Sequence, residues 1–190
     1  LWKHQSLMIV YGKLFIMHKA LFNRKRILCY FVCAQFFIVI NANHTNTSQF
    51  QLHKNTDSLY VLQLITETGT DTWRLPYPVY QFSIGDVNND GNDDALVGVI
   101  KRTRYDSTVR KRIFIFKNYN GHVRALWMGS RLGRPIVDFR FYDGVLRSIE
   151  EDDDGLFLVA EYRWSSFGMD FIRYLCRGVT IEKAQSILYQ

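Results

Sequence analysis

A run of oxygen-bearing side chains around one glycine is the part of this sequence whose residue types and spacing best suit chemistry. Residues 86–94 read Asp-Val-Asn-Asn-Asp-Gly-Asn-Asp-Asp. A hard cation such as Ca²⁺ takes roughly 6 to 8 oxygen ligands, and Gly91 permits the sharp bend that a tight loop needs. The spacing therefore predicts a calcium site formed by side-chain oxygens of Asp86, Asn88, Asp90 and Asp94 and by the carbonyl of Asn92.

The residues that follow this loop place it between two strands. An EF-hand needs a bidentate glutamate at its twelfth position and a helix on each side, whereas Val97 stands there, inside the apolar run 95–100. A polar hairpin turn without metal is the alternative, because Asn, Asp and Gly favour turns for conformational reasons alone. The crowding of several carboxylates exceeds what a turn requires and favours a bound cation.

Residues 84–98, Ile-Gly-Asp-Val-Asn-Asn-Asp-Gly-Asn-Asp-Asp-Ala-Leu-Val-Gly, resemble the FG-GAP or VCBS repeat. This repeat is the calcium-loop blade of integrin-α-type β-propellers and of many secreted bacterial proteins. The sequence departs from the pattern at Val99-Ile100, where the family has Ala-Pro, and it lacks the Phe-Gly opening. Neither departure touches a ligand position. The resemblance implies that the metal ligands are Asp86, Asn88, Asp90, Asn92 and Asp94.

The first 42 residues have the character of an export signal. They hold six of the chain's 24 basic residues and no acid, so the remainder carries 18 basic and 18 acidic residues and gives no reason to expect a nucleic-acid partner. Arg24-Lys25-Arg26 precedes the apolar run 27–40, which is shorter than the ~20 residues of a spanning helix. We expect a signal peptide over 1–42, cleaved after Ala42, with Met17 as a possible true start. An uncleaved anchor is the alternative.

From Asn43 onward the sequence predicts an all-β domain. Strand-like runs follow one another at short intervals, and helical periodicity begins only near the last dozen residues. Residues 118–121, Asn-Tyr-Asn-Gly, predict a tight hairpin. Several runs are apolar at both odd and even positions, which predicts strands covered on both faces. The predicted strands span 59–66, 79–84, 95–101, 112–117, 122–128, 136–142, 145–149, 156–164 and 169–176.

An internal repeat indicates propeller-like organisation. Residues 74–86 align with residues 131–143 at an offset of 57, and residues 113–116 align with residues 171–174 at an offset of 58. A period of this length suits one four-stranded antiparallel blade. We therefore expect blades at approximately 76–132 and 133–190, about two to two and a half units in all. Propellers close with about 4 to 8 blades, so the ring would be incomplete and its open edges could support self-association.

Other groups of residues are weaker candidates for binding. The basic loop from Lys101 to Arg112 could contact an acidic glycan or another acidic surface, but solubilising loops of this kind are common. The acidic run 150–155 could hold a second cation, although a solvated turn is the simpler interpretation. Sugar stacking is conceivable for several aromatic residues, for which core packing is favoured: Trp73, Trp127, Tyr162, Trp164 and Phe167.

No arrangement of His, Ser, Cys or carboxylate residues matches a nucleophile or zinc motif, so we expect a non-enzymatic protein. Cys176, the one cysteine after the signal, is expected to be buried among apolar residues. The expected function is that of an exported calcium-binding β-repeat protein that binds a protein or glycan partner, with Ca²⁺ in a structural role. The alternatives are an accessory domain or enzyme that acts on polysaccharide, and a signal-anchored membrane protein.

Overall fold

Strands dominate the part of the chain described by the structure, a computed structural model that covers residues 48–104, 106–129 and 132–190. The predicted signal peptide, residues 1–42, with its cleavage site and the start at Met17, lies outside the described residues. The expected all-β class is confirmed. The elements are β1 (Gln49–Thr56), β2 (Leu59–Thr66), β3 (Gly69–Leu75), β4 (Val79–Gly85), β5 (Asp94–Lys101), β6 (Arg110–Tyr119), β7 (His122–Met128), β8 (Ile136–Tyr142), β9 (Val145–Glu151), β10 (Phe157–Ser165), β11 (Gly168–Val179) and α1 (Ile181–Leu188).

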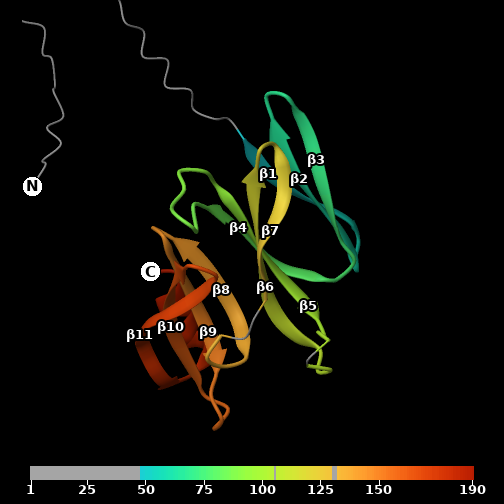
Figure 1. Cartoon of the computed structure of the whole chain (residues 1–190). Coiled ribbons are helices and arrows are strands. Elements are labelled where there is room, and N and C mark those ends of the chain that lie inside the picture. Colours follow the sequence, from blue (N-terminus) through green and yellow to red (C-terminus); the bar gives the residue numbers. More distant parts are fainter. Residues whose placement is uncertain (1–47, 105, 130–131) are drawn as a thin grey trace, which may run out of the picture. The chain divides into compact units, whose positions relative to one another are not determined.

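Strands that are consecutive in the chain lie next to one another in three antiparallel sheets (Figure 1). The sheets are β1-β2-β3, β4-β5-β6-β7 and β8-β9-β10-β11, and none of them closes into a barrel within the described residues. The sequence prediction lacks β1 and β3. Each of these strands is largely exposed, since β1 buries only Phe50 and β3 only Leu75. Neither strand therefore shows the apolar alternation by which a half-buried strand is recognised.

Two-residue turns fix the register of two hairpins. Asn120-Gly121 connects β6 to β7 with φ values of 53° and 81°, and Asp143-Gly144 connects β8 to β9 with φ values of 51° and 72°. Positive φ at both central residues is the pattern of a type I′ turn, whose twist matches that of the flanking strands. The hairpin predicted from residues 118–121 is confirmed.

The β4–β7 sheet is buried on both faces. Leu96 and Ile115 lie in an apolar cluster shared with the β8–β11 sheet. Their neighbours Val97 and Phe116 point the opposite way, into a cluster shared with the β1–β3 sheet. Burial of a side chain of this size stabilises the fold by about 1.5–3 kcal/mol. The expectation that strands with apolar residues at both odd and even positions are covered on both faces is confirmed.

Helix α1 covers part of the outer face of the β8–β11 sheet. Ala184 and Leu188 of the helix are buried against Ile149 and Val159 of the sheet. The helix begins after Thr180, whose hydroxyl accepts a hydrogen bond from the Lys183 backbone N–H and so caps the first turn. Beyond the area covered by the helix, the same sheet face carries charged side chains that line a pocket.

Two glycines allow the β4–β7 and β8–β11 sheets to approach closely. A Cβ atom at Gly98 would lie 2.7 Å from the ring of Tyr80 and 2.9 Å from the ring of Phe139. A Cβ atom at Gly85 would lie 2.6 Å from the ring of Phe141. Real Cβ atoms are not found at such separations, so the aromatic rings occupy space that only glycine leaves open.

The Tyr80 hydroxyl is buried between these sheets and has no hydrogen-bond partner among the described residues. Burial and, to a smaller extent, the charge of Asp138 raise the pKa of this phenol. An unsatisfied buried hydroxyl carries a desolvation cost without a compensating bond. We therefore expect Tyr80→Phe to leave the free energy of unfolding unchanged or to raise it by about 1 kcal/mol, as measured by urea denaturation.

Tyr162 provides a matched control for that substitution. Its hydroxyl is also buried, but it donates to Glu150 over 2.8 Å and accepts from the Gly133 N–H over 3.1 Å. Tyr162→Phe should therefore lower the free energy of unfolding by about 1–3 kcal/mol. Equal losses in the two variants would show that the Tyr80 hydroxyl has a partner after all.

The strand order bears on the internal repeat. The alignment at offset 57 pairs β4 with β8, and each is the first strand of its sheet. The two strands also contact each other, since the Gln81 amide donates to the carboxylate of Asp138, its partner in the alignment, over 3.4 Å. The alignment at offset 58 is wrong as a match of equivalent strands, because residues 113–116 lie in the third strand of one sheet and residues 171–174 in the fourth strand of the other.

Candidate functional site

The predicted calcium loop occupies the connection between β4 and β5 and folds around its own carboxylates. One oxygen of Asp86 accepts the Asp90 N–H over 3.1 Å, and the other accepts the Gly91 N–H over 2.8 Å. Positive φ values at Asn89 (59°) and Gly91 (85°) turn the backbone so that these N–H groups point inward. The bend that the glycine was predicted to permit is present.

The middle of the loop is organised by Asp90. Its carboxylate accepts the Asn92 N–H and the Asn92 side-chain amide, each over 3.0 Å, and the Asn88 side-chain amide over 2.9 Å. Burial acts to raise the pKa of Asp90, but the hydrogen bonds from Asn88 and Asn92 outweigh it and hold this pKa below its usual range. Asp90 is therefore an anion in the folded loop and a strong oxygen ligand for a hard cation.

Asp94 closes the loop from the first position of β5 and is fully buried. One carboxylate oxygen accepts the N–H groups of Val87 over 3.0 Å and Asn88 over 3.4 Å, while the other has no hydrogen-bond partner among the described residues. Burial raises the pKa of this carboxyl group to about 7, with the negative charges of Asp90 and Asp86 adding to the effect. A buried oxygen that lacks a donor is costly unless it is protonated or binds a cation.

These contacts bring the five predicted ligands into one loop without forming a finished metal centre. Within the residues that the structure describes, no three acidic, histidine or cysteine side chains are gathered closely enough to hold a metal ion. The donor set nevertheless suits calcium, because it consists of carboxylate and amide oxygens from Asp86, Asn88, Asp90, Asn92 and Asp94. Either a proton or a cation would satisfy the oxygen of Asp94 that has no hydrogen-bond partner among the described residues.

Much of the basic loop between Lys101 and Arg112 is engaged within the protein. Arg112 is buried, pairs with Asp106 over 2.9 Å and donates to the Lys101 carbonyl over 3.1 Å. The Lys101 ammonium lies 4.0 Å from the ring centre of Tyr77. Lys111 donates to the carbonyl of Val137 in β8. These three cations stabilise the sheet, which reduces the charge that the loop can present to an acidic partner.

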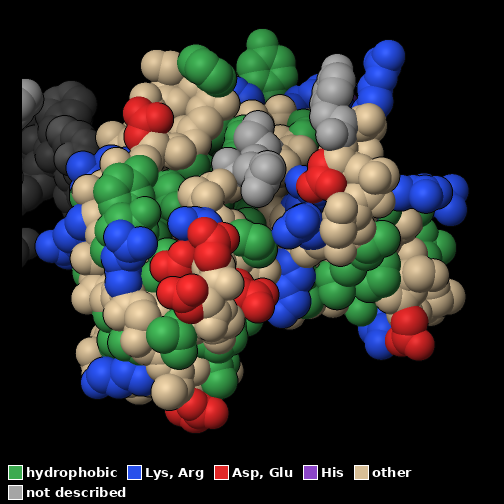
Figure 2. All heavy atoms as spheres, turned by 90° about the horizontal axis from the view of Figure 1, so that it is seen from below, with side chains coloured by type: hydrophobic (Ala, Val, Ile, Leu, Met, Phe, Trp, Pro, Cys, Tyr) green, Lys and Arg blue, Asp and Glu red, His purple; other side chains and the backbone are tan. Residues whose placement is uncertain are grey.

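The acidic run 150–155 has internal partners as well. The buried Glu150 carboxylate accepts from the Ser148 hydroxyl over 2.6 Å and from the Arg134 N–H over 2.6 Å. Arg134 also pairs with Asp152 over 3.3 Å and with Asp153 over 2.6 Å. Acidic and basic side chains stand beside one another on the face shown in Figure 2. Arg134 thus pairs with two of the five acids in this run, and none of these contacts favours a second cation site.

The aromatic candidates divide by burial. Tyr162 and Trp127 lie in the core, Trp164 packs against the same cluster, and Trp73 stands 5.4 Å from Phe116 between ring centres. Core packing, the favoured interpretation, is confirmed for these four residues. The expectation of core packing is wrong for Phe167, which lies in the turn between β10 and β11 and is 88 % exposed.

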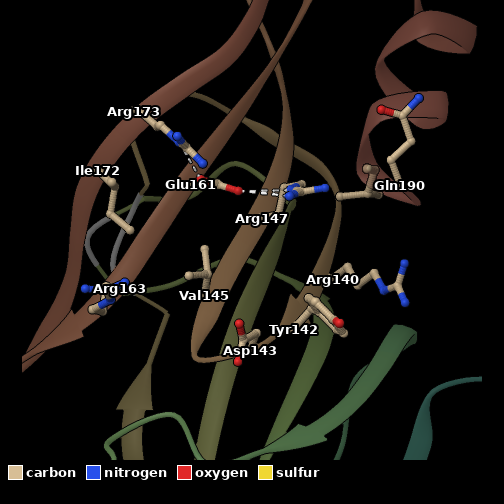
Figure 3. Close-up of a pocket in the computed structure, with 11 residues that line it drawn as sticks. Arg140, Tyr142, Asp143, Val145, Arg147, Glu161, Arg163, Ile172, Arg173 and Gln190 are labelled. Carbon is tan, nitrogen blue, oxygen red and sulfur yellow. Dashed lines mark hydrogen bonds and ion pairs between the residues drawn. The ribbon is translucent and has the colours of Figure 1, made fainter.

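A pocket of about 430 Å³ on the outer face of the β8–β11 sheet is lined by charged side chains that sequence reasoning missed (Figure 3). Its charged lining residues come from all four strands and from the β8–β9 turn. The sequence of β10 contains a signal for this surface. Residues 157–160 are all apolar, whereas charged and aromatic side chains alternate in Glu161-Tyr162-Arg163. That change marks the point where the outer face stops being covered and becomes polar. The charged residues are Arg140, Asp143, Arg147, Glu161, Arg163 and Arg173.

Comparisons with protein-family models, with curated proteins and with solved structures find no match for this chain. Among the described residues, no helix combines the length and the apolar character needed to cross a bilayer.

The half-buried Cys176 packs beside the cluster that joins α1 to the sheet.

Proposed function

We propose that this chain is an exported calcium-binding β-repeat protein that acts as an interaction module, with Ca²⁺ stabilising the loop between β4 and β5. One observation carries the proposal: Asp94 buries a carboxylate oxygen that has no hydrogen-bond donor among the described residues, in a loop where the negative charges of Asp90 and Asp86 act on this carboxyl group. Acidic groups crowded in this way repel one another, and a divalent cation removes the repulsion.

Calcium would be held by oxygens that the loop already directs inward. Asp86, Asp90 and Asp94 would supply charge, and Asn88 and Asn92 neutral oxygens. Binding requires the side-chain amides of Asn88 and Asn92 to release the Asp90 carboxylate, after which Asn88 would present its side-chain oxygen and Asn92 its carbonyl. The ion would connect the end of β4 to the start of β5 and so stabilise the sheet that packs against both others. Its role is structural.

The sheet arrangement supports a propeller-like interpretation of the domain. Each sheet is a meander of consecutive strands, and the sheets are stacked face to face through continuous apolar clusters. The chain passes from the last strand of one sheet, β3 or β7, directly to the first strand of the next, β4 or β8. This order is typical of propeller blades. We propose that the three sheets are blade-like repeats of an incomplete ring.

The charge state of Glu161 in the pocket favours binding of a polysaccharide over its hydrolysis. A glycosidase needs one carboxyl group with a raised pKa to serve as general acid. Burial acts to raise the pKa of Glu161, yet hydrogen bonds from Arg173 and Arg147 outweigh it and hold this pKa below its usual range. Glu161 is therefore a fixed anion that positions arginines. We propose a partner-binding role rather than hydrolysis.

Calcium is expected to raise the melting temperature, and Asp90→Ala is expected to abolish the rise. At a calcium concentration ten times the Kd, binding to the folded state alone adds about 1.4 kcal/mol, which corresponds to about 3–6 °C for a domain of this size. The measurement is differential scanning calorimetry in excess calcium and in chelator.

Asp93→Ala is the control for this experiment, because Asp93 is an exposed acid of the same loop outside the predicted ligand set. It removes the same charge and should retain the calcium response. Identical melting curves for the wild type in calcium and in chelator would refute the calcium role.

A further inference from the structure

The pocket on the outer face of the β8–β11 sheet is built around a row of charged side chains that crosses all four strands. Arg140 of β8 is opposite Arg147 of β9, Arg147 is opposite Glu161 of β10, and Glu161 is opposite Arg173 of β11. Residues directly opposite in a sheet have their side chains in contact range on one face. The row therefore places three guanidinium groups and one carboxylate side by side.

Glu161 fixes two of these arginines in position. One of its oxygens accepts from the Nη2 of Arg147 over 2.9 Å, and the other accepts from the Nε of Arg173 over 2.7 Å. Arg147 also donates through Nη1 to the carbonyl of Ile187 in α1 over 2.9 Å. The carboxylate is buried, and the Arg147 side chain is 27 % exposed whereas that of Arg173 is 65 % exposed, so the ion pair with Arg147 is the less screened by solvent. The floor of the pocket is thus held in place before any ligand arrives.

The positive charge of the pocket exceeds what its acids neutralise. The charged lining residues are four arginines and two acids, Asp143 and Glu161, which leaves an excess of two positive charges. Arg140 and Arg163 form no ion pair with any described acid. Arg140 instead lies over the ring of Tyr142, 5.6 Å from its centre. Two like charges directly opposite each other, as at Arg140 and Arg147, destabilise a sheet unless an anion lies between them.

Several arginine donors remain available to such an anion. Arg173 uses its Nε for Glu161, and among the described residues its two Nη nitrogens have no hydrogen-bond partner. The guanidinium group of Arg163 likewise has no hydrogen-bond partner among the described residues. A guanidinium fork binds a carboxylate or sulfate through paired N–H donors. Figure 3 shows Arg163 and Arg173 on one side of the pocket and Arg140 on the other.

The remaining walls suit a sugar ring. Tyr142 is 70 % exposed and Ile172 is 41 % exposed, so both present apolar surface to a bound ring. Asp143 offers acceptors for sugar hydroxyl groups, and the Gln190 side chain offers a donor and an acceptor. The volume of about 430 Å³ lies within the range of small-molecule sites. Since the pocket lies on the face of a sheet, where backbone groups are already paired, it provides no edge to which an extended peptide could add as a strand.

We propose that this pocket binds an acidic sugar, with Arg163 and Arg173 contacting a carboxylate or sulfate group from one side, Arg140 contacting a further oxygen of the sugar from the other side, and Tyr142 stacking on the ring. The inference deepens the proposed interaction module by naming a ligand class and a contact surface. Its arginines lie on β8–β11, whereas the calcium loop joins β4 to β5, although Tyr142 and Asp143 at the edge of the pocket also line a shallow hollow with Asp86 of that loop. Uronate and sulfated sugars share the oxyanion that the arginines recognise.

The test is isothermal titration calorimetry of the full chain with three probes: trigalacturonate, its neutral methyl ester, and a sulfated galactose disaccharide. We expect at least one anionic probe to bind and the ester to bind at least about tenfold more weakly, since it lacks the charge that the arginines contact. The double substitution Arg140→Gln/Arg163→Gln should weaken anionic binding by about tenfold or more. Binding of only the uronate or only the sulfated probe identifies the source of the oxyanion.

Arg74→Gln is the matched control, because Arg74 is an exposed strand arginine on the distant β1–β3 sheet. This control should bind the anionic probe like the wild type, and circular dichroism should show all variants folded. Three results would overturn the proposal: measurable binding of both trigalacturonate and its ester with equal affinity, equal weakening by Arg74→Gln, or no heat of binding with either anionic probe at millimolar concentration. If the pocket binds sugar but calcium has no effect on melting, the calcium role alone fails.

Discussion

In calcium-free buffer the wild-type protein is expected to lose stability, relative to an Asp94→Asn variant, as the pH rises from about 4 to about 7. Asp94 has a folded-state pKa of about 7 and an ordinary value of 3.8 in the unfolded chain. Between these values the folded state binds the proton and the unfolded state does not. The free energy of unfolding therefore falls with rising pH across this window. Below the lower pKa the contribution of Asp94 is fully present.

The expected size of this loss is large for a single side chain. The difference between the two pKa values corresponds to about 4 kcal/mol once both states are ionised. The asparagine side chain has a similar shape and no charge, so the Asp94→Asn variant should lack this slope. Taking the difference between the two proteins cancels the titration of the histidines and of the other acids. The measurement is urea denaturation at half-unit pH intervals in the presence of chelator.

Calcium should remove the slope from the wild type. A carboxylate that ligates Ca²⁺ is deprotonated, so the ion lowers the folded-state pKa of Asp94. The folded state then no longer binds an extra proton between about pH 4 and about pH 7, and the free energy of unfolding no longer falls across this range. Saturating calcium should therefore stabilise the wild type more at pH 7.5 than at pH 5. Asp93→Asn, the exposed neighbour, should keep the wild-type profile in both buffers. A wild-type profile parallel to that of Asp94→Asn in chelator would contradict the assigned burial of this carboxylate.

The positions of the loop and the hairpins could be predicted from the sequence because local rules decide them. Residues 86–94 fold into a tight loop because alternate Asx side chains accept hydrogen bonds from N–H groups a few residues away. The turn at Asn120-Gly121 follows from the positive φ values that these two residue types tolerate. Neither feature depends on contacts with distant parts of the chain, so spacing and residue type were sufficient.

The arginine pocket could not be predicted because strand register decides it. Arg140, Arg147, Glu161 and Arg173 are separated by up to 33 positions in the sequence and meet only because three hairpins place them opposite one another. A shift of one residue in any strand would turn its side chain to the other face. The β10–β11 pairing contains several register shifts, so even correct strand assignments would not have aligned Arg173 with Glu161.

Gly98→Val is expected to lower the free energy of unfolding by about 3 kcal/mol, although valine ordinarily favours strands. The added Cβ would stand 2.7 Å from the Tyr80 ring and 2.9 Å from the Phe139 ring, and both rings are confined between the β4–β7 and β8–β11 sheets. The sheets must separate or the rings must leave their rotamers, and either response opens the cluster that joins them. Urea denaturation measures the loss. Gly168→Val is the control, because a Cβ there meets no atom within 4 Å. Equal changes in the two variants would show that the close contact between the sheets does not contribute to stability.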